Sequence, residues 1–224
     1  MATGATKLNA LGPAEPFRVF LLSPADCSGK RAELLQRPDP GHPLGRKLHG
    51  GGGAALGEVF SFVSSLYFRG KLAYARAFAR PPRGQGGIHV ITPSDGLRPP
   101  ESLLRPGDLR RYAGVPVDAE EERYRRPLLR DLRALAPAWA EAEVVLLGSI
   151  ASRKYVELLT AVLGDRVLFP SDFVGRGDMS RGGLMLRSVE EGRELPYVPV
   201  LGAVRRGRRP ARLPPKGGEP REAT

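Results

Sequence analysis

The stretch "AEVVLLGSIASRKYVELLTAVLG", residues 142–164, joins an apolar run to a helical pattern through a short polar turn. The run at 142–148 is typical of a strand buried on both faces. In residues 154–164 the apolar side chains recur at helical spacing, and Ser149 or Ser152 can cap that helix. A strand buried on both faces needs helices on each side, so this stretch indicates an α/β layer structure.

The same alternation of apolar runs and helical patterns extends over most of the chain. Three more strands are predicted, at residues 17–23, 87–96 and 166–170. Helices are predicted at 56–80, with a possible break at Gly70; at 118–136, starting at Asp118 and bent or split by Pro127; and at 180–192, ended by Gly192. The pattern predicts a three-layer α/β domain with a mostly parallel central sheet of four or more strands.

Proline, glycine and charge mark the expected domain boundaries. Residues 1–16 are predicted to be a flexible lead-in, and 17–202 a single α/β domain. Residues 36–53, rich in glycine and proline, are predicted to be a long loop or a mobile insertion. Residues 203–224 are too polar and too rich in proline and glycine to bury themselves, which predicts a basic disordered tail.

Composition and charge narrow the classes of function. The chain has 224 residues, 41% hydrophobic content, a formal net charge of +11 and a pI near 10.4. A basic surface attracts polyanions, although the predicted tail carries about five of the eleven charges. The single cysteine, Cys27, excludes an internal disulfide and a multi-cysteine metal site.

Other classes are excluded by spacing and hydropathy. The histidines, His42, His49 and His89, lack metal-ligand spacing, so no metal and no cofactor is predicted. No apolar run approaches the roughly 18 residues that a membrane helix needs. The expectation is a cytoplasmic protein that does not interact with a membrane, and its oligomeric state stays open.

Four polar segments follow the predicted strands and are expected to converge. In open α/β sheets ligands bind in the crevice beyond the carboxyl ends of the strands. The segments are "SPADCSGK" (23–30), "TPSDGLRPPE" (92–101), "GSIASRK" (148–154) and "PSDFVGRGDMSRG" (170–182).

Phosphate binding is the chemistry that these segments favour most. Small residues at turns and helix starts expose backbone N–H groups, and nearby cations neutralise an anion. The plain alternatives are solvated turns, an ordinary N-cap at Ser149, and internal ion pairs. The candidates are Ser28, Lys30, Arg98, Ser149, Arg153, Lys154, Arg176 and Arg181.

Catalytic candidates are fewer. Ser94 supplies a hydroxyl, and Asp95 or Asp172 supplies a carboxylate that can act as a general base or position a water. The Ser-Asp-Gly sequence also makes a good turn by itself, and the aspartates beside arginines can simply fix the loop. Cys27 lacks a histidine at an interpretable spacing, so an inert cysteine is favoured over a nucleophile.

The segment 64–78 mixes aromatic side chains with Arg69, Lys71 and Arg76. Interleaved rings and cations can stack bases and contact phosphates, which predicts nucleic-acid binding here, with Arg69 and Lys71 as the candidate residues. An amphipathic helix with a basic outer face gives the same composition.

The order of these motifs resembles the YaaA-like domains of unknown function, a bacterial group related to the peroxide-stress protein YaaA. The resemblance covers roughly residues 17–185. It rests on Cys-Ser-Gly-Lys (27–30), "LYFRGKLAYARAFA" (66–79), "HVITPSDGLRPPESLLRPGDLRRY" (89–112) and "VVLLGSIASRKYVELL" (144–159).

The middle motif also looks like the accessory domain of archaeosine synthase, whose fold is similar to uracil-DNA glycosylases. These groups commonly carry a Ser-Ala-Lys-His/Tyr-Gly-Leu turn where this chain has Thr92 to Leu97, so the lysine of that turn is missing here. The resemblance implies an α/β fold and a link to nucleic acid or to oxidative DNA damage.

Three functions stay open on the sequence. The first is a protein that binds DNA or RNA and acts on a base or nucleotide. The second is a hydrolase or transferase of a small nucleotide or nucleoside, using the same crevice. The third is a non-catalytic interaction module whose basic tail recruits a partner.

Overall fold

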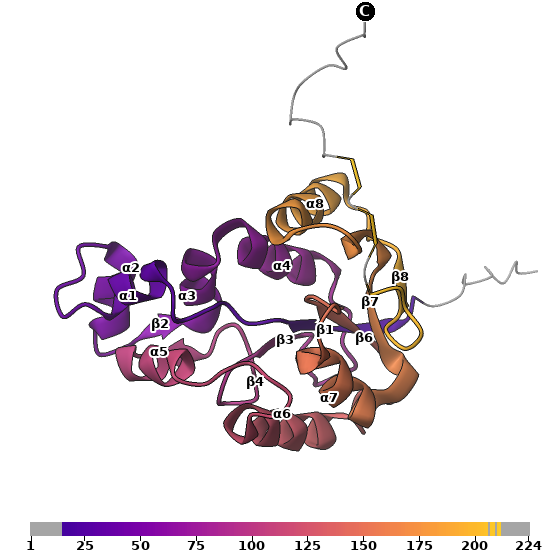
Figure 1. The fold of residues 1–224 in the computed structure, drawn as a ribbon, viewed down its shortest axis with the longest axis horizontal. Coiled ribbons are helices and arrows are strands. Elements are labelled where there is room, and N and C mark those ends of the chain that lie inside the picture. The colour runs from indigo at the N-terminus through magenta and orange to yellow at the C-terminus, as the bar shows by residue number, and fades with distance from the viewer. Residues whose placement is uncertain (1–14, 206, 209, 212–224) are drawn as a thin grey trace, which may run out of the picture.

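A six-stranded sheet runs through the middle of the molecule (Figure 1). The computed structural model describes residues 15–205, 207–208 and 210–211. The strand order is β4-β3-β1-β6-β7-β8, in which β3, β1, β6 and β7 are parallel and the edge strands β4 and β8 are antiparallel. The strands are β1 (Phe17–Leu22), β3 (Ile88–Ile91), β4 (Leu97–Arg98), β6 (Ala142–Leu147), β7 (Val167–Pro170) and β8 (Tyr197–Pro199).

Both faces of this sheet are buried, as the apolar runs predicted. In β1, Val19 and Leu21 point to one face while Phe20 and Leu22 point to the other, and all four side chains are buried. The two faces belong to two separate apolar clusters. A sheet with two dry faces needs a layer of helices on each, which confirms the predicted three-layer α/β class.

Two pairs of helices cover the two faces. The helices α4 (Ser65–Phe78) and α8 (Asp178–Glu191) pack on the face that holds Phe20. The helices α6 (Glu122–Leu135) and α7 (Arg153–Leu163) pack on the opposite face (Figure 1). The helix predicted at 180–192 is confirmed, with Gly192 ending it in the left-handed conformation.

The remaining elements form a lobe on the left of Figure 1. The helix α2 runs through residues predicted to be a loop, so that prediction was wrong. Pro43 opens the helix, the His42 ring accepts a hydrogen bond from the Leu44 N–H, and Leu48 is buried. The lobe comprises α1 (Lys30–Gln36), α2 (Pro43–His49), α3 (Leu56–Val63), α5 (Pro106–Ala113), and a small sheet of β2 (Ala54–Ala55) and β5 (Leu103–Leu104).

A close approach of α4 and α8 sets the position of the site. A Cβ atom added at Gly182 would lie 2.7 Å from the Leu66 carbonyl oxygen, and one added at Gly70 would lie 2.7 Å from the Gly182 carbonyl oxygen. Gly70 therefore lets the two helices pack backbone to backbone and does not break the helix. The break between α3 and α4 lies instead at Ser64 and Ser65, where Ser65 has a φ of 48°.

One other boundary, the start of α6, differs from the prediction. The helix α6 starts at Glu122, four residues after the predicted Asp118, because the Glu121 side chain accepts a hydrogen bond from the Arg123 N–H and caps it. Pro127 lies within α6 without splitting it. The Ser152 residue holds the N-cap position of α7 but makes no side-chain capping bond.

The ends of the chain are only partly described. Residues 1–14 of the predicted lead-in and residues 206, 209 and 212–224 of the predicted tail lie outside the described residues. In the described part, Glu15 pairs with Arg80, and the backbone of Arg208 lies against Gly175. None of the helices in the described residues has the length and apolar character needed to span a membrane.

Candidate functional site

A crevice of about 630 Å³ opens at the carboxyl ends of the parallel strands. Each of the four polar segments contributes to its wall: Ser23 to Ser28 after β1, Pro93 after β3, Ser149 and Lys154 after β6, and Asp178 at the start of α8. Tyr67, Tyr112 and Tyr155 add aromatic surface. The structure thus brings the four segments together as the topology rule predicts.

A compact group of polar residues lies at the wall of this crevice, and we call it the Ser23 cluster. Ser23, Tyr67 and Tyr155 line the crevice, and the fourth member, Lys71, is bonded to Ser23. Lys71 Nζ donates to the Ser23 carbonyl oxygen at 2.6 Å and to Ser23 Oγ at 2.9 Å. It also lies 4.4 Å from the centre of the Tyr67 ring. Helix α4 carries both residues one turn apart, which places them on the same helix face, toward the crevice.

Lys71 is completely buried without a carboxylate partner in ion-pair distance among the described residues. Burial lowers the pKa of its ammonium to about 7, while the charge of Asp178 raises it and those of Arg181 and Lys154 lower it. A large share of Lys71 is therefore a neutral amine near pH 7. The sequence-based role for Lys71, direct contact with nucleic acid, does not fit a side chain with no exposed surface.

Burial also shifts the pKa values of the two tyrosines of the cluster, Tyr67 and Tyr155. Burial raises the pKa of Tyr67 to about 12, with smaller effects of Arg181, Asp178 and Ser23. The Tyr67 hydroxyl is buried and makes no hydrogen bond to a described residue. Burial also raises the pKa of Tyr155, which Ser23 lowers slightly. An unbonded buried hydroxyl at a cavity wall is a hydrogen-bonding position left for a ligand or water.

A glycine makes room for Ser23. A Cβ atom added at Gly148 would lie 3.0 Å from Ser23 Cβ and 3.3 Å from Ser23 Oγ. Gly148 follows β6, the strand that pairs with β1 in register. The adjacent strand end therefore has no side chain, which leaves space beside the Ser23 hydroxyl.

The predicted phosphate-binding residues are divided between the crevice and other places. Ser28, Ser149 and Lys154 line the crevice. Ser28 is already occupied, since its hydroxyl and its N–H donate to Asp26, and these bonds lower the pKa of that carboxyl. Lys30, Arg69 and Arg98 are exposed and do not line the crevice.

The arginines of the segment 170–182 hold their own loop together. Arg176 donates to the Asp172 carbonyl oxygen and to Ser180 Oγ, and Arg181 donates to the Phe173 carbonyl oxygen and to Asp178. Arg153, at the start of α7, pairs with Glu157. The geometry favours the interpretation that these arginines make internal contacts over the interpretation that they bind phosphate. Arg176 and Arg181 therefore fix the start of α8.

Two of the predicted catalytic residues, Ser94 and Asp95, do not line the crevice, although Pro93 before them does. Asp95 accepts hydrogen bonds from Arg111, Tyr112 and Ser94. Burial by itself raises the pKa of this carboxyl, but the bonds from Arg111 and Tyr112 outweigh it and the pKa is lowered. A carboxylate with three donors and a low pKa is a poor general base at neutral pH. The side chain of Asp172 is exposed and does not line the crevice.

The environment of Cys27 favours an unreactive thiol over a nucleophile. Its side chain is buried, and burial raises the pKa of the thiol to about 12, so the thiolate is scarce at neutral pH. In the part of the chain that the structure describes, no group of histidine, cysteine, aspartate and glutamate side chains is arranged to hold a metal ion.

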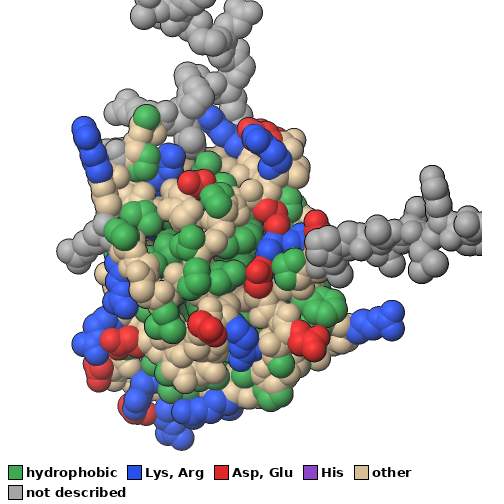
Figure 2. All heavy atoms as spheres, turned by 90° about the vertical axis from the view of Figure 1, so that its right-hand side faces the viewer, with side chains coloured by type: hydrophobic (Ala, Val, Ile, Leu, Met, Phe, Trp, Pro, Cys, Tyr) green, Lys and Arg blue, Asp and Glu red, His purple; other side chains and the backbone are tan. Residues whose placement is uncertain are grey.

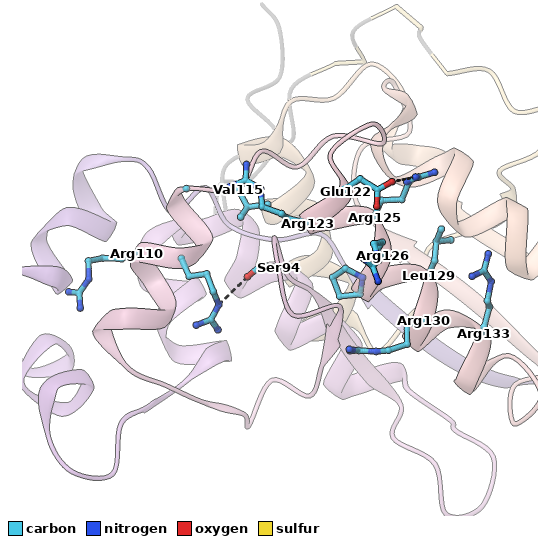
Figure 3. A pocket seen from close by; sticks show the side chains of 13 residues that line it. Ser94, Arg110, Val115, Glu122, Arg123, Arg125, Arg126, Leu129, Arg130 and Arg133 are labelled. Atoms are coloured by element: carbon cyan, nitrogen blue, oxygen red, sulfur yellow. Dashed lines mark hydrogen bonds and ion pairs between the residues drawn. The ribbon is translucent and has the colours of Figure 1, made fainter.

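A second cavity, which we call the arginine groove, lies between α5 and α6 and has a volume of about 1110 Å³ (Figure 3). Among the described residues, seven arginines and a single acidic residue, Glu122, line it. Figure 3 shows Arg110 on the α5 side of Ser94 and Arg125, Arg126, Arg130 and Arg133 on the other side, with their side chains pointing in different directions. The seven arginines are Arg110, Arg111, Arg123, Arg125, Arg126, Arg130 and Arg133.

Three of these arginines have no ionic partner among the described residues: Arg110, Arg126 and Arg133. The other four pair with carboxylates, Arg111 with both Asp95 and Asp108, Arg123 with Glu121, Arg125 with Glu122, and Arg130 with Asp131. Exposed pairs of this kind contribute little and exchange easily, so the arginines can turn to another anion.

Sequence reasoning missed this groove although the sequence carries a signal for it. Arg123, Arg126, Arg130 and Arg133 recur at intervals of three and four residues, which places them on one face of α6. The buried residues Tyr124, Leu128 and Leu132 occupy the opposite face. The spacing of these arginines in the sequence indicates a cationic stripe on the solvent side of an amphipathic helix.

The arginine groove and the crevice adjoin. Gly114 and Val115 line both cavities. Residues that are adjacent in the sequence also line different cavities. Pro93 lines the crevice and Ser94 the groove, and Tyr112 lines the crevice and Arg111 the groove. A ligand lying in the groove can therefore extend into the crevice.

A different surface is apolar. Figure 2 looks at the side of the molecule that holds β7 and β8, where hydrophobic side chains gather in the centre. A shallow hollow of about 390 Å³ lies there, lined by Phe169, Ser171, Val174, Val198, Pro199, Leu201, Gly202, Ala203 and Val204.

Known proteins do not add to this description. No family model, no curated protein and no solved structure matches the chain. The resemblance to YaaA-like domains therefore stays a prediction.

Proposed function

We propose that the protein binds nucleic acid through the arginine groove and places one nucleotide unit in the crevice. The observation that carries the proposal is the groove itself: seven arginines around a cavity that continues into a pocket. Arginine presents several N–H donors in a plane and is well suited to phosphate oxygens. In this function the arginines of α5 and α6 bind the phosphates, and not the strand-end loops for which the sequence predicted that role.

The crevice complements the groove in character. Of the described residues that line it, Asp26 and Asp178 are acidic and one, Lys154, is a cation, so it is a poor place for several phosphates. Its tyrosines and prolines suit a flat ring, and its volume of about 630 Å³ is enough for a nucleoside. An uncharged base or sugar is the part of a nucleotide that fits this wall.

The volume of the crevice also favours the second candidate, a small-molecule nucleotide enzyme. In that case a nucleotide would bind with its base in the crevice and its phosphates on Arg111 at the boundary.

The cytoplasmic location and the role of the tail in recruiting a partner stay predictions. Most of the tail lies outside the described residues.

Binding of a fluorescent single-stranded oligonucleotide to the full chain tests the proposal. The double variant R126E/R133E should lower affinity by about tenfold or more and should flatten the salt dependence of binding. Neither residue has an ionic partner among the described residues, so little structure is lost.

The matched control is R37E/R83E, which makes the same change in charge at two exposed arginines outside the groove. An equal loss of affinity in both double variants would show a general charge effect and contradict the groove. Thermal-shift measurements with mononucleotides separate the second candidate, because a selective ligand raises the melting temperature by mass action.

A further inference from the structure

The Ser23 cluster holds a hydroxyl next to a buried amine at the wall of the crevice. The Nζ atom of Lys71 lies 2.9 Å from Ser23 Oγ, and Ser23 lines the cavity. A hydrogen bond between a hydroxyl and a neighbouring base is the arrangement that activates nucleophilic serines, and lysine serves as the base in some of them. Neither the nucleic-acid proposal nor the structural role of α4 accounts for this pair.

We propose that Ser23 is a nucleophile for acyl transfer and that Lys71 is its general base. The substrate class is an uncharged carboxylic ester that enters the crevice beside Ser23. This step does not require the arginine groove, so it stands or falls separately from nucleic-acid binding.

The protonation state of Lys71 supports the role of base. Burial lowers its pKa to about 7, and the charged groups that face it are Asp178 and Arg181 from α8 and Lys154 from α7. The rings of Tyr67 and Phe68, on its own helix, cover the rest of the amine. Near neutral pH the neutral amine has a lone pair for the Ser23 proton, while one of its N–H groups still donates to the Ser23 carbonyl oxygen.

The charges in the crevice favour an ester over a phosphodiester. A phosphodiester is an anion before it reacts, and Asp26 and Asp178 would repel it. An ester carbonyl acquires one negative charge only when it is attacked. Lys154 and the free N–H groups at the start of α7 lie at the same wall, and the unbonded Tyr67 hydroxyl adds a further donor.

The reaction balances without a further reagent except water. The Ser23 Oγ proton moves to Lys71 Nζ as the bond from Oγ to the carbonyl carbon forms. The bond from that carbon to the leaving oxygen then breaks, and Lys71 returns the proton to the departing alcohol. Water attacks the acylated Ser23 with Lys71 again as base, the acid is released, and the proton returns to Ser23 Oγ.

Labelling of the full-length protein with a fluorophosphonate probe tests this assignment, since the probe phosphonylates an activated serine with loss of fluoride. Mass spectrometry should find one adduct, on Ser23, and S23A should abolish it. The controls are S61A and S102A, which remove two serines that do not line the crevice and should keep full labelling.

The pH profile tests the role of Lys71. The labelling rate should rise about tenfold per pH unit below about pH 7 and level off above it, and K71M should reduce it at least a hundredfold. If K71M does not fold, the profile of the unaltered protein decides, because a rate that is flat from about pH 5 to pH 8 contradicts a titrating base.

Two results would overturn the proposal: no adduct on the unaltered protein, or an adduct that survives S23A. The variant R126E/R133E should label at the unaltered rate. Loss of oligonucleotide binding with retained labelling would separate the two proposals, and so would the reverse.

Discussion

The crevice and the arginine groove differ in how they treat charge. At the wall of the crevice the cation of the Ser23 cluster, Lys71, is fully buried and has no carboxylate partner among the described residues, and burial lowers its pKa to about 7. In the groove seven arginines stand at the surface, and the four that are paired belong to exposed pairs that exchange easily. The same type of charge thus serves as a reactive group in one region and as part of an electrostatic surface in the other.

The two regions also depend on different parts of the fold. The crevice needs the contact between α4 and α8, because Tyr67 and Lys71 lie on one helix and Asp178 on the other. The groove is lined mainly by residues of α5 and α6, together with Ser94, Gly114 and Val115. Variants should therefore damage one region and spare the other.

The largest expected effect is on the helix contact. A Cβ atom at Gly182 would lie 2.7 Å from the Leu66 carbonyl oxygen and 2.9 Å from Tyr67 Cα, so G182A must push the two backbones apart. We expect a loss of roughly 3 kcal/mol in the free energy of unfolding by chemical denaturation.

The matched control is G41A, since a Cβ atom at Gly41 meets no atom within 4 Å, and its stability should change by less than about 0.5 kcal/mol. Below its melting temperature, G182A should lose labelling of Ser23 but keep binding of the oligonucleotide. Loss of both activities in folded G182A would mean that the regions are not independent.

The second prediction concerns the buried cation. The folded pKa of Lys71, about 7, lies below its ordinary value of 10.5, so between these values the unfolded chain binds more protons. The stability of the unaltered protein should rise with pH in this window, and the penalty for burying the charge should be fully present below about pH 7.

K71M lacks that penalty, so its stability relative to the unaltered protein should be highest at about pH 6 and should fall by up to about 1.4 kcal/mol per pH unit between about pH 7 and pH 9. Urea unfolding at a series of pH values measures it. A constant difference across this range would mean that Lys71 does not titrate there.

The fold could be predicted from the sequence more fully than the residues of the site. The parallel sheet and the convergence of four polar segments followed from apolar runs and from the general rule for strand ends, and the structure has both. The helix α2 was missed because its apolar residues, Leu44 and Leu48, are only two among many prolines and glycines.

The choice of residues within the crevice was harder to predict. A sequence shows that Arg176 and Arg181 carry charge, but not that carbonyl oxygens of the same loop already accept their N–H groups. Lys71 looked like part of a basic outer face because the helical phase that buries it depends on the packing of α4 against α8. Ser23 is one serine among several in the sequence, and only the fold places an amine beside it.

A third, smaller effect is expected when a carboxylate paired with a groove arginine is removed. Asp95 is one of two carboxylates paired with Arg111, so D95N should release part of that charge and raise oligonucleotide affinity by about twofold to fivefold. Fluorescence anisotropy at low salt measures it. The same variant should leave labelling of Ser23 unchanged, whereas a strong decrease would restore Asp95 as a catalytic candidate.

The smallest effect is expected for the residues that sequence reasoning favoured. Arg153 pairs with Glu157 and Arg176 donates to the Asp172 carbonyl oxygen, so R153A/R176A removes two cations that already have partners. Its oligonucleotide affinity should fall by less than about twofold, against roughly tenfold for R126A/R133A, which makes the same chemical change at two arginines without an ionic partner among the described residues. If the two double variants weaken binding equally, phosphate contacts are not confined to the groove, and the strand-end loops share the role that their sequence indicates.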